Sequence, residues 1–136
     1  MDERAVAEAL ALDAQWVDEL RRGWLALIEV AVWGDIHGLH PGGSGRIRRR
    51  VVEAGERLRS LTASRDWIPR PREQLKNALA SALSVEEALA ALAHDARNLQ
   101  GADVTRVEQA LAQLHALLAQ RLPDLKDRWA ALLESR

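Results

Sequence analysis

Apolar residues recur every three or four positions along most of the chain, the spacing of one buried helix face. Between residues 6 and 34 this spacing is unbroken, and it predicts one long N-terminal helix. Further helices are predicted over about 46–64, 71–83 and 84–99. Because no stretch alternates with the period of two that marks a half-buried strand, an all-α fold is expected.

Glycine, proline and capping residues set the expected ends of these helices. The run 40–45 contains Pro41 and three glycines, so it is expected to be the main loop. Pro69 and Pro71 break the chain after the second helix. Ser84 and Glu87 have the spacing of a capping box, which predicts a helix start at Ser84.

The C-terminal part predicts two helices that run antiparallel. Asp103 is expected to cap a fifth helix that extends to Leu122, and Pro123 is expected to end or kink it before a last short helix. A short link after the helix over 84–99 predicts an antiparallel hairpin. The expected fold is therefore a single domain, residues 1–136, built as a compact all-α bundle of five to six helices with a long N-terminal helix.

The composition narrows the possible functions. The chain has 136 residues and no cysteine, which excludes disulfides, thiolate zinc sites and cysteine nucleophiles. With 19 Lys and Arg against 20 Asp and Glu, it is not a polycationic coat protein. The longest apolar stretch, Trp24 to Trp33, is half of the roughly 20 residues that a membrane-spanning helix needs. No secretory signal is visible, so a cytoplasmic protein without membrane contact is expected.

Positive charge is nevertheless concentrated in one segment. Nine arginines and three acids give residues 46–72 a charge of +6. At 100° per residue, three of these arginines share one flank of the predicted helix, and this arrangement suits contacts with a phosphate backbone. A nearby tryptophan is able to stack on a base. The candidate contact for nucleic acid or for another acidic partner consists of Arg46, Arg49, Arg50, Arg57 and Trp67.

An alternative interpretation of the same segment is an ordinary solvated helix face. Arg49, Glu53 and Arg57 follow one another at intervals of four residues, and Glu56 precedes Arg59 by three. Such pairs stabilise a helix locally and need no partner molecule.

The stretch from Trp24 to Trp33 is apolar around nearly the whole helix, so it is expected to be enclosed by this chain or by a second one. Trp24, Glu29 and Trp33 are therefore the candidate protein interface. Glu29 interrupts the run and must be paired, protonated or turned to an open edge. A metal ligand or a general base is the alternative role for this carboxylate.

The histidines fall into separate classes. His115 lies near the apolar side of its helix and is expected to be a hydrogen-bonded core residue. His37 and His40, close to Asp35, have a spacing that suits a divalent metal if a further ligand is added. Because no four-ligand pattern accompanies them, neither a metal site nor a cofactor is expected.

His94 is predicted to be exposed beside Asp95. The string from His94 to Asn98 resembles the phosphoacceptor box of histidine-kinase dimerisation domains. That resemblance implies that His94 accepts a phosphoryl group and that Asp95 orients the imidazole. The chain departs from that family because it has no ATP-binding domain and because Gly101 ends the helix early.

No motif of an enzyme is present, since the chain has neither a nucleotide-binding glycine turn nor a serine nucleophile elbow. We expect a non-enzymatic binding or adaptor protein, or a small subunit of a larger assembly, with a protein partner or a second copy on its apolar helix. Small helical subunits of nucleoprotein assemblies, such as CRISPR effector complexes, are similar in general character. No small-molecule substrate is inferred. The alternatives are phosphotransfer through His94 and a histidine-based metal-binding bundle.

Overall fold

The computed structural model describes residues 2–36, 44–63, 70–97 and 102–135; the side chains of residues 31–36, 44–46 and 102–104 lie outside that description. Within these ranges all regular structure is helical, which confirms the all-α prediction. The helices are α1 (Glu3–Leu10), α2 (Ala14–Ile36), α3 (Ser44–Leu61), α4 (Pro71–Ala96) and α5 (Ala102–Glu134). In the part of the chain described, no helix is long and apolar enough to cross a membrane.

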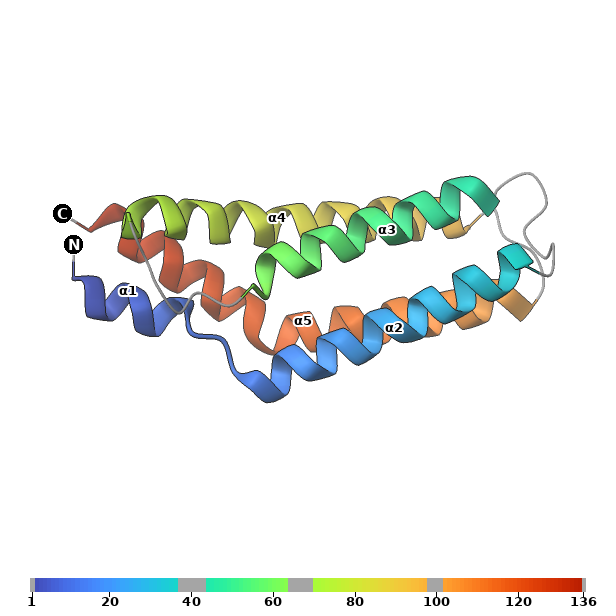
Figure 1. Ribbon diagram of the computed structural model, residues 1–136, viewed down its shortest axis with the longest axis horizontal. Helices are drawn as coiled ribbons and strands as arrows, with labels where there is room; N and C mark the ends of the chain where they lie inside the picture. Colours follow the sequence, from blue (N-terminus) through green and yellow to red (C-terminus); the bar gives the residue numbers. More distant parts are fainter. Residues whose placement is uncertain (1, 37–43, 64–69, 98–101, 136) are drawn as a thin grey trace.

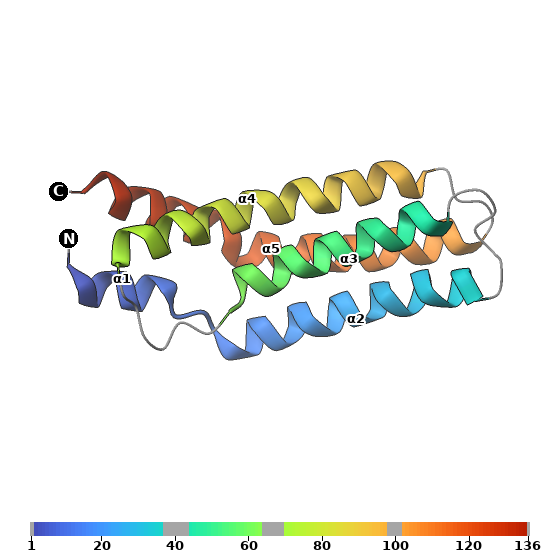
Figure 2. The same cartoon turned by 45° about the horizontal axis from the view of Figure 1, so that its top comes forward.

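The four longer helices lie lengthwise beside one another and alternate in direction along the chain, as Figure 1 shows. α3 packs against α2 and α4, and α5 packs against the same two helices from the other side (Figure 2). Within the described residues, the diagonal pairs α2 with α4 and α3 with α5 bring no Cα atoms within 8 Å of one another. α1 lies at one end, against α4 and α5. The result is a square bundle around a core of mainly leucine and alanine side chains.

The predicted long N-terminal helix is wrong, because the chain breaks into α1 and α2 at residues 11–13. Ala11 has an extended backbone, with φ of −79° and ψ of 101°. The Asp13 carboxylate then accepts hydrogen bonds from the backbone N–H groups of Gln15, at 2.8 Å, and Trp16, at 3.2 Å. These are free donors of the first turn of α2, so Asp13 starts a new helix inside an apolar pattern that looked continuous.

The predicted helix start at Ser84 is also wrong, since α4 runs without interruption from Pro71 to Ala96. Pro71 begins this helix, where its missing N–H costs nothing. No glycine or proline follows within the helix, and the buried positions keep a spacing of three or four residues past Ser84. Continuous packing of that face outweighs the local capping signal at Ser84 and Glu87.

Pro123 lies inside α5 and does not end it, so the predicted separate last helix is part of α5. The ribbon of α5 changes direction in its orange-to-red part (Figure 1). A proline ring removes one backbone hydrogen bond and displaces the carbonyl four residues earlier, which bends a helix. The bend brings the end of α5 toward α1.

Three tryptophans join helices by donating the indole N–H to a backbone carbonyl. Trp16 of α2 donates to Leu117 of α5 at 2.7 Å, and the fully buried Trp129 of α5 donates to Ala9 of α1 at 2.9 Å. Trp24 of α2 donates to Val51 of α3 at 3.5 Å. The Ala9 carbonyl belongs to the last turn of α1, where carbonyls lack helical partners, so Trp129 also satisfies that helix end.

Glycine is required where α2 approaches α3. A Cβ atom built on Gly55 would lie 2.2 Å from Cζ2 of Trp24, far inside van der Waals contact. The indole therefore packs directly on the backbone of α3. At Gly23 the corresponding Cβ would lie 2.8 Å from Cδ2 of Leu114, the end of a flexible side chain.

Replacing Gly55 by alanine is expected to destabilise the fold, although alanine in a helix interior normally stabilises it by about 0.5–1 kcal/mol. The new methyl group must displace the Trp24 ring, and such overpacking costs about 1–3 kcal/mol. Chemical denaturation monitored by circular dichroism measures the change. Gly23→Ala is the matched control and should cost less, because a leucine end moves more easily than an indole ring. Equal stability of the two variants would contradict this account of the contact between α2 and α3.

Candidate nucleic-acid interface

The α3 helix presents its apolar face to the core and its arginines to the two sides of that face. The buried positions repeat at three and four residues and are Ile47, Val51, Ala54, Leu58 and Leu61. Of the predicted contact residues, Arg49 and Arg57 are exposed and Arg50 is half-buried. Arg46 lies in the helix, but its side chain is outside the described residues, as is the whole of Trp67.

Arg50 binds two acids of its own chain. Its Nε donates to Oδ2 of Asp95 in α4 at 2.9 Å, and one terminal nitrogen donates to Oε2 of Glu53 at 3.2 Å. The Asp95 side chain is only 8% exposed, and Asp95 is the one buried charged residue in the part of the chain described. The hydrogen bond to Asp95, followed by that to Glu53, raises the pKa of the Arg50 guanidinium. Arg50 therefore compensates a buried carboxylate and joins α3 to α4.

The same contact bears on the phosphotransfer alternative. His94 is exposed, as predicted. The adjacent Asp95 carboxylate is directed to α3, where Arg50 holds Oδ2. The resemblance implied that Asp95 orients the His94 imidazole. In the structure, Asp95 instead binds Arg50 of another helix.

Arg57 opens onto a polar groove between the end of α3 and the first half of α4. The groove encloses about 550 Å³, and its polar lining consists of Arg57, Ser60, Gln74, Asn77, Ser81 and Ser84. Among the described residues, no Asp or Glu lines it. Hydroxyl and amide side chains of this kind, with an arginine, are the groups that contact nucleic-acid phosphates and sugars in proteins.

The α4 side of this groove is a feature that sequence reasoning missed. Asn77, Ser81, Ser84 and Asp95 fall on one line of α4, together with small alanines, at intervals of three or four residues. The buried side of this helix is otherwise apolar. A stripe of small and polar residues on such a helix indicates a close, polar contact with a neighbouring helix, and this signal was present in the sequence.

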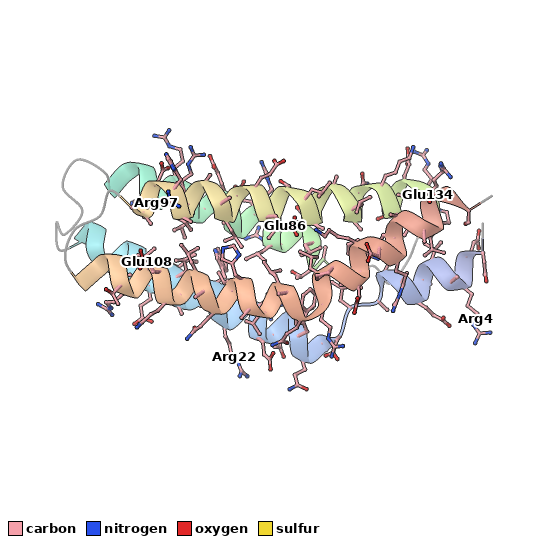
Figure 3. The ribbon with its side chains drawn as sticks, turned by 180° about the vertical axis from the view of Figure 1, so that it is seen from behind. Arg4, Arg22, Glu86, Arg97, Glu108 and Glu134 are labelled. Carbon is pink, nitrogen blue, oxygen red and sulfur yellow. The ribbon has the colours of Figure 1, made fainter. Side chains whose placement is uncertain are left out.

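The beginning of α3 carries charges of the unfavourable sign. Its first turn contains no acid, and arginines occupy positions 46, 48, 49 and 50. The N-terminus of a helix is itself positive because its free N–H groups point outward, and arginines three or four residues apart repel one another. Arg97, at the end of α4, lies at the same end of the bundle (Figure 3). The first turns of α3 therefore concentrate positive charge.

The α2 face around the predicted protein interface is not enclosed by this chain. Leu25 is 53% exposed and Glu29, one turn further on, is exposed, so this chain does not enclose these positions, and their enclosure by a second chain stays a prediction. Glu29 lies at the open edge that the prediction allowed. Trp24 is half-buried against α3, and the side chain of Trp33 lies outside the described residues.

The remaining histidines add no metal site within the described residues, where no group of three or more His, Asp or Glu side chains gathers. His37 and His40 lie outside that part of the chain, as does the Asp35 side chain. The prediction of a core His115 is wrong, because this residue is exposed. The buried face of α5 is centred on positions such as Val107, Leu114 and Leu118, and a residue one step past Leu114 is rotated 100° beyond it.

Comparisons with models of protein families, with curated proteins and with solved structures found no match to this chain.

Removing the Asp95 carboxylate is expected to destabilise the bundle more than removing that of Glu53. Asp95 is buried, so Asp95→Ala deletes the ion pair between α3 and α4 and leaves a gap, whereas Glu53 is 39% exposed and solvent replaces its carboxylate. Urea denaturation of Asp95→Ala and Glu53→Ala gives the order. If Glu53→Ala were the more harmful change, the proposed role of the Arg50 to Asp95 contact would be incorrect.

Proposed function

We propose that this protein is a non-enzymatic binding module that contacts the phosphate backbone of a nucleic acid through α3 and the groove between α3 and α4. The observation that carries the proposal is the concentration of arginines at the N-terminus of α3 without an acid in its first turn. Such an arrangement costs helix stability through both the helix dipole and mutual repulsion. An anion bound there removes both costs.

The available guanidiniums define the contact. Arg49 and Arg57 are exposed and form no ion pair among the described residues, whereas Arg50 already binds Asp95 and Glu53. Arg46 shares the flank of Arg50 and Arg57 by helical position. We therefore assign phosphate contacts to Arg46, Arg49 and Arg57 and a structural role to Arg50.

The polar groove favours a phosphate backbone over an acidic protein surface. Next to Arg57 it offers neutral hydroxyl and amide groups, among them Gln74, Asn77 and Ser81. These side chains donate hydrogen bonds to phosphate and sugar oxygens without adding charge, so a chain of evenly spaced phosphates has partners both on the helix and in the groove.

A protein partner or a second copy of the chain is proposed for the other side of the bundle. The outer face of α2 presents Leu25 next to Glu29, an apolar side chain beside a carboxylate. An adaptor or small subunit has such a second contact in addition to a nucleic-acid flank. Light scattering over a dilution series, with Leu25→Glu for comparison, measures self-association through this face.

Binding of a labelled oligonucleotide is expected to depend strongly on salt. With three phosphate contacts, affinity should fall about 40-fold between 50 and 200 mM monovalent salt, from a slope of about −0.9 per contact. Arg49→Gln combined with Arg57→Gln should weaken binding and reduce the slope from about −2.7 to about −0.9. Fluorescence anisotropy at several salt concentrations measures both quantities.

The control removes the same charge from another part of the molecule. Arg4 of α1 and Arg22 of α2 are exposed and point away from α3 (Figure 3). Arg4→Gln with Arg22→Gln should leave affinity and slope nearly unchanged. The nucleic-acid proposal fails if both double variants weaken binding equally, or if the protein binds polyglutamate and no nucleic acid.

A further inference from the structure

A second recess lies on the opposite side of α3, between α3 and α2. It encloses about 290 Å³, close to the lower limit of about 300 Å³ for small-molecule pockets. Its floor and walls are apolar and include Leu20, Trp24, Leu25, Gly55 and Leu58. The glycine and the indole that rests on it shape this recess, because any larger residue at position 55 would push the ring into it.

The rim of the recess is positively charged. Arg21 of α2 and Arg59 of α3 line it, and no Asp or Glu of the described ranges does. Arg59 forms no ion pair among the described residues, and Arg21 has only an exposed contact of 3.7 Å with Asp18. Thr62 also lines the recess, but its hydroxyl already donates to the carbonyl of Leu58 at 2.8 Å and offers only an acceptor. Within the described lining, the two guanidiniums are thus the charged donors that a ligand meets.

We propose that this recess binds a small amphipathic carboxylate, a molecule with an apolar body and one anionic end. The body lies on Trp24 and Leu25 and covers the exposed part of that leucine. The carboxylate lies between Arg21 and Arg59, which recognise its charge and its two oxygens. This site is separate from the proposed nucleic-acid contact, which uses the other flank of α3, so those two proposals can fail independently. It shares Leu25 with the protein contact proposed for α2, so a bound carboxylate and a protein partner would compete for this side chain.

The recess matches such a ligand both in its apolar surface and in its charge. The half-exposed Leu25 and the indole face provide apolar surface that gains free energy when water leaves it. The rim carries two positive charges and no acid from the part of the chain that the structure describes, which disfavours a cationic amphiphile and gives an anionic one an advantage over a neutral one. The size of the recess excludes a bulky ligand.

Octanoate, octanol and octyltrimethylammonium, which share an alkyl chain and differ in charge, test the proposal on the full-length protein. The readout is the indole N–H signal of Trp24 in a ¹⁵N–¹H spectrum, assigned with Trp24→Phe, with affinity from its titration. Octanoate should shift this signal at lower concentration than octanol, and the ammonium compound should not shift it. Equal affinities of the three compounds, or no shift of the Trp24 signal at millimolar octanoate, would overturn the proposal.

Variants separate the contributions of the rim and of the wall. Arg59→Gln should weaken octanoate binding by about three- to fivefold, the size expected for a rim ion pair, and should leave octanol unaffected. Arg48→Gln, on the same helix and also exposed, is the matched control and should leave octanoate affinity unchanged.

Leu25→Ser should weaken binding of both octanoate and octanol, because it removes apolar wall without touching the core. Leu83→Ser changes an equally exposed leucine, 48% exposed on α4, and should have no effect. If Arg48→Gln and Leu83→Ser weakened binding as much as their partners, octanoate would be adsorbing without a site and the proposal would be wrong.

Discussion

The packing of Trp24 on Gly55 is the constraint on which the arrangement of the charged surface depends. It brings α2 onto the backbone of α3 and thereby fixes how α3 is rotated about its own axis. Once that rotation is fixed, one arginine flank faces α4 and the other faces α2. A different rotation would bury Arg57 or separate Arg50 from Asp95. The basic flank and the apolar recess are therefore two results of one contact between a ring and a helix backbone.

The contact between Arg50 and Asp95 fixes the same helix from its other side. A buried carboxylate is costly unless a positive partner reaches it, and the partner comes from α3. Apolar packing alone tolerates small slips of one helix along another, whereas this hydrogen bond of 2.9 Å joins two defined points. One arginine of the basic segment therefore specifies the register of α3 and α4, and its neighbours remain available to a partner molecule.

The sequence alone predicted the helical class, because that class depends on the spacing of apolar residues within each helix. It misplaced the breaks, since capping signals such as Ser84 depend on whether neighbouring turns pack. Asp13 was a true cap hidden inside an apolar pattern, and Ser84 was a false one. His115 was assigned to the core because it follows Leu111 by four residues, yet the buried face of α5 is centred elsewhere.

The candidate site was predictable only in part for the same reason. The clustering of arginines is visible in the sequence. That Arg50 is bound to Asp95, and so is not available to a partner molecule, depends on two residues 45 positions apart. The recess between α2 and α3 depends on an absent side chain at Gly55 opposite a ring 31 positions earlier. No periodicity within a single helix encodes such pairs.

The hydrogen bond from Trp129 to Ala9 joins residues separated by 120 positions. Both chain ends lie at the same end of the bundle (Figure 1). Contacts this distant in sequence form only after a long segment has been ordered, because closing the intervening loop costs entropy. α1 is therefore expected to dock last during folding and to detach first during partial unfolding, which would give this short helix faster amide hydrogen exchange than the four longer helices.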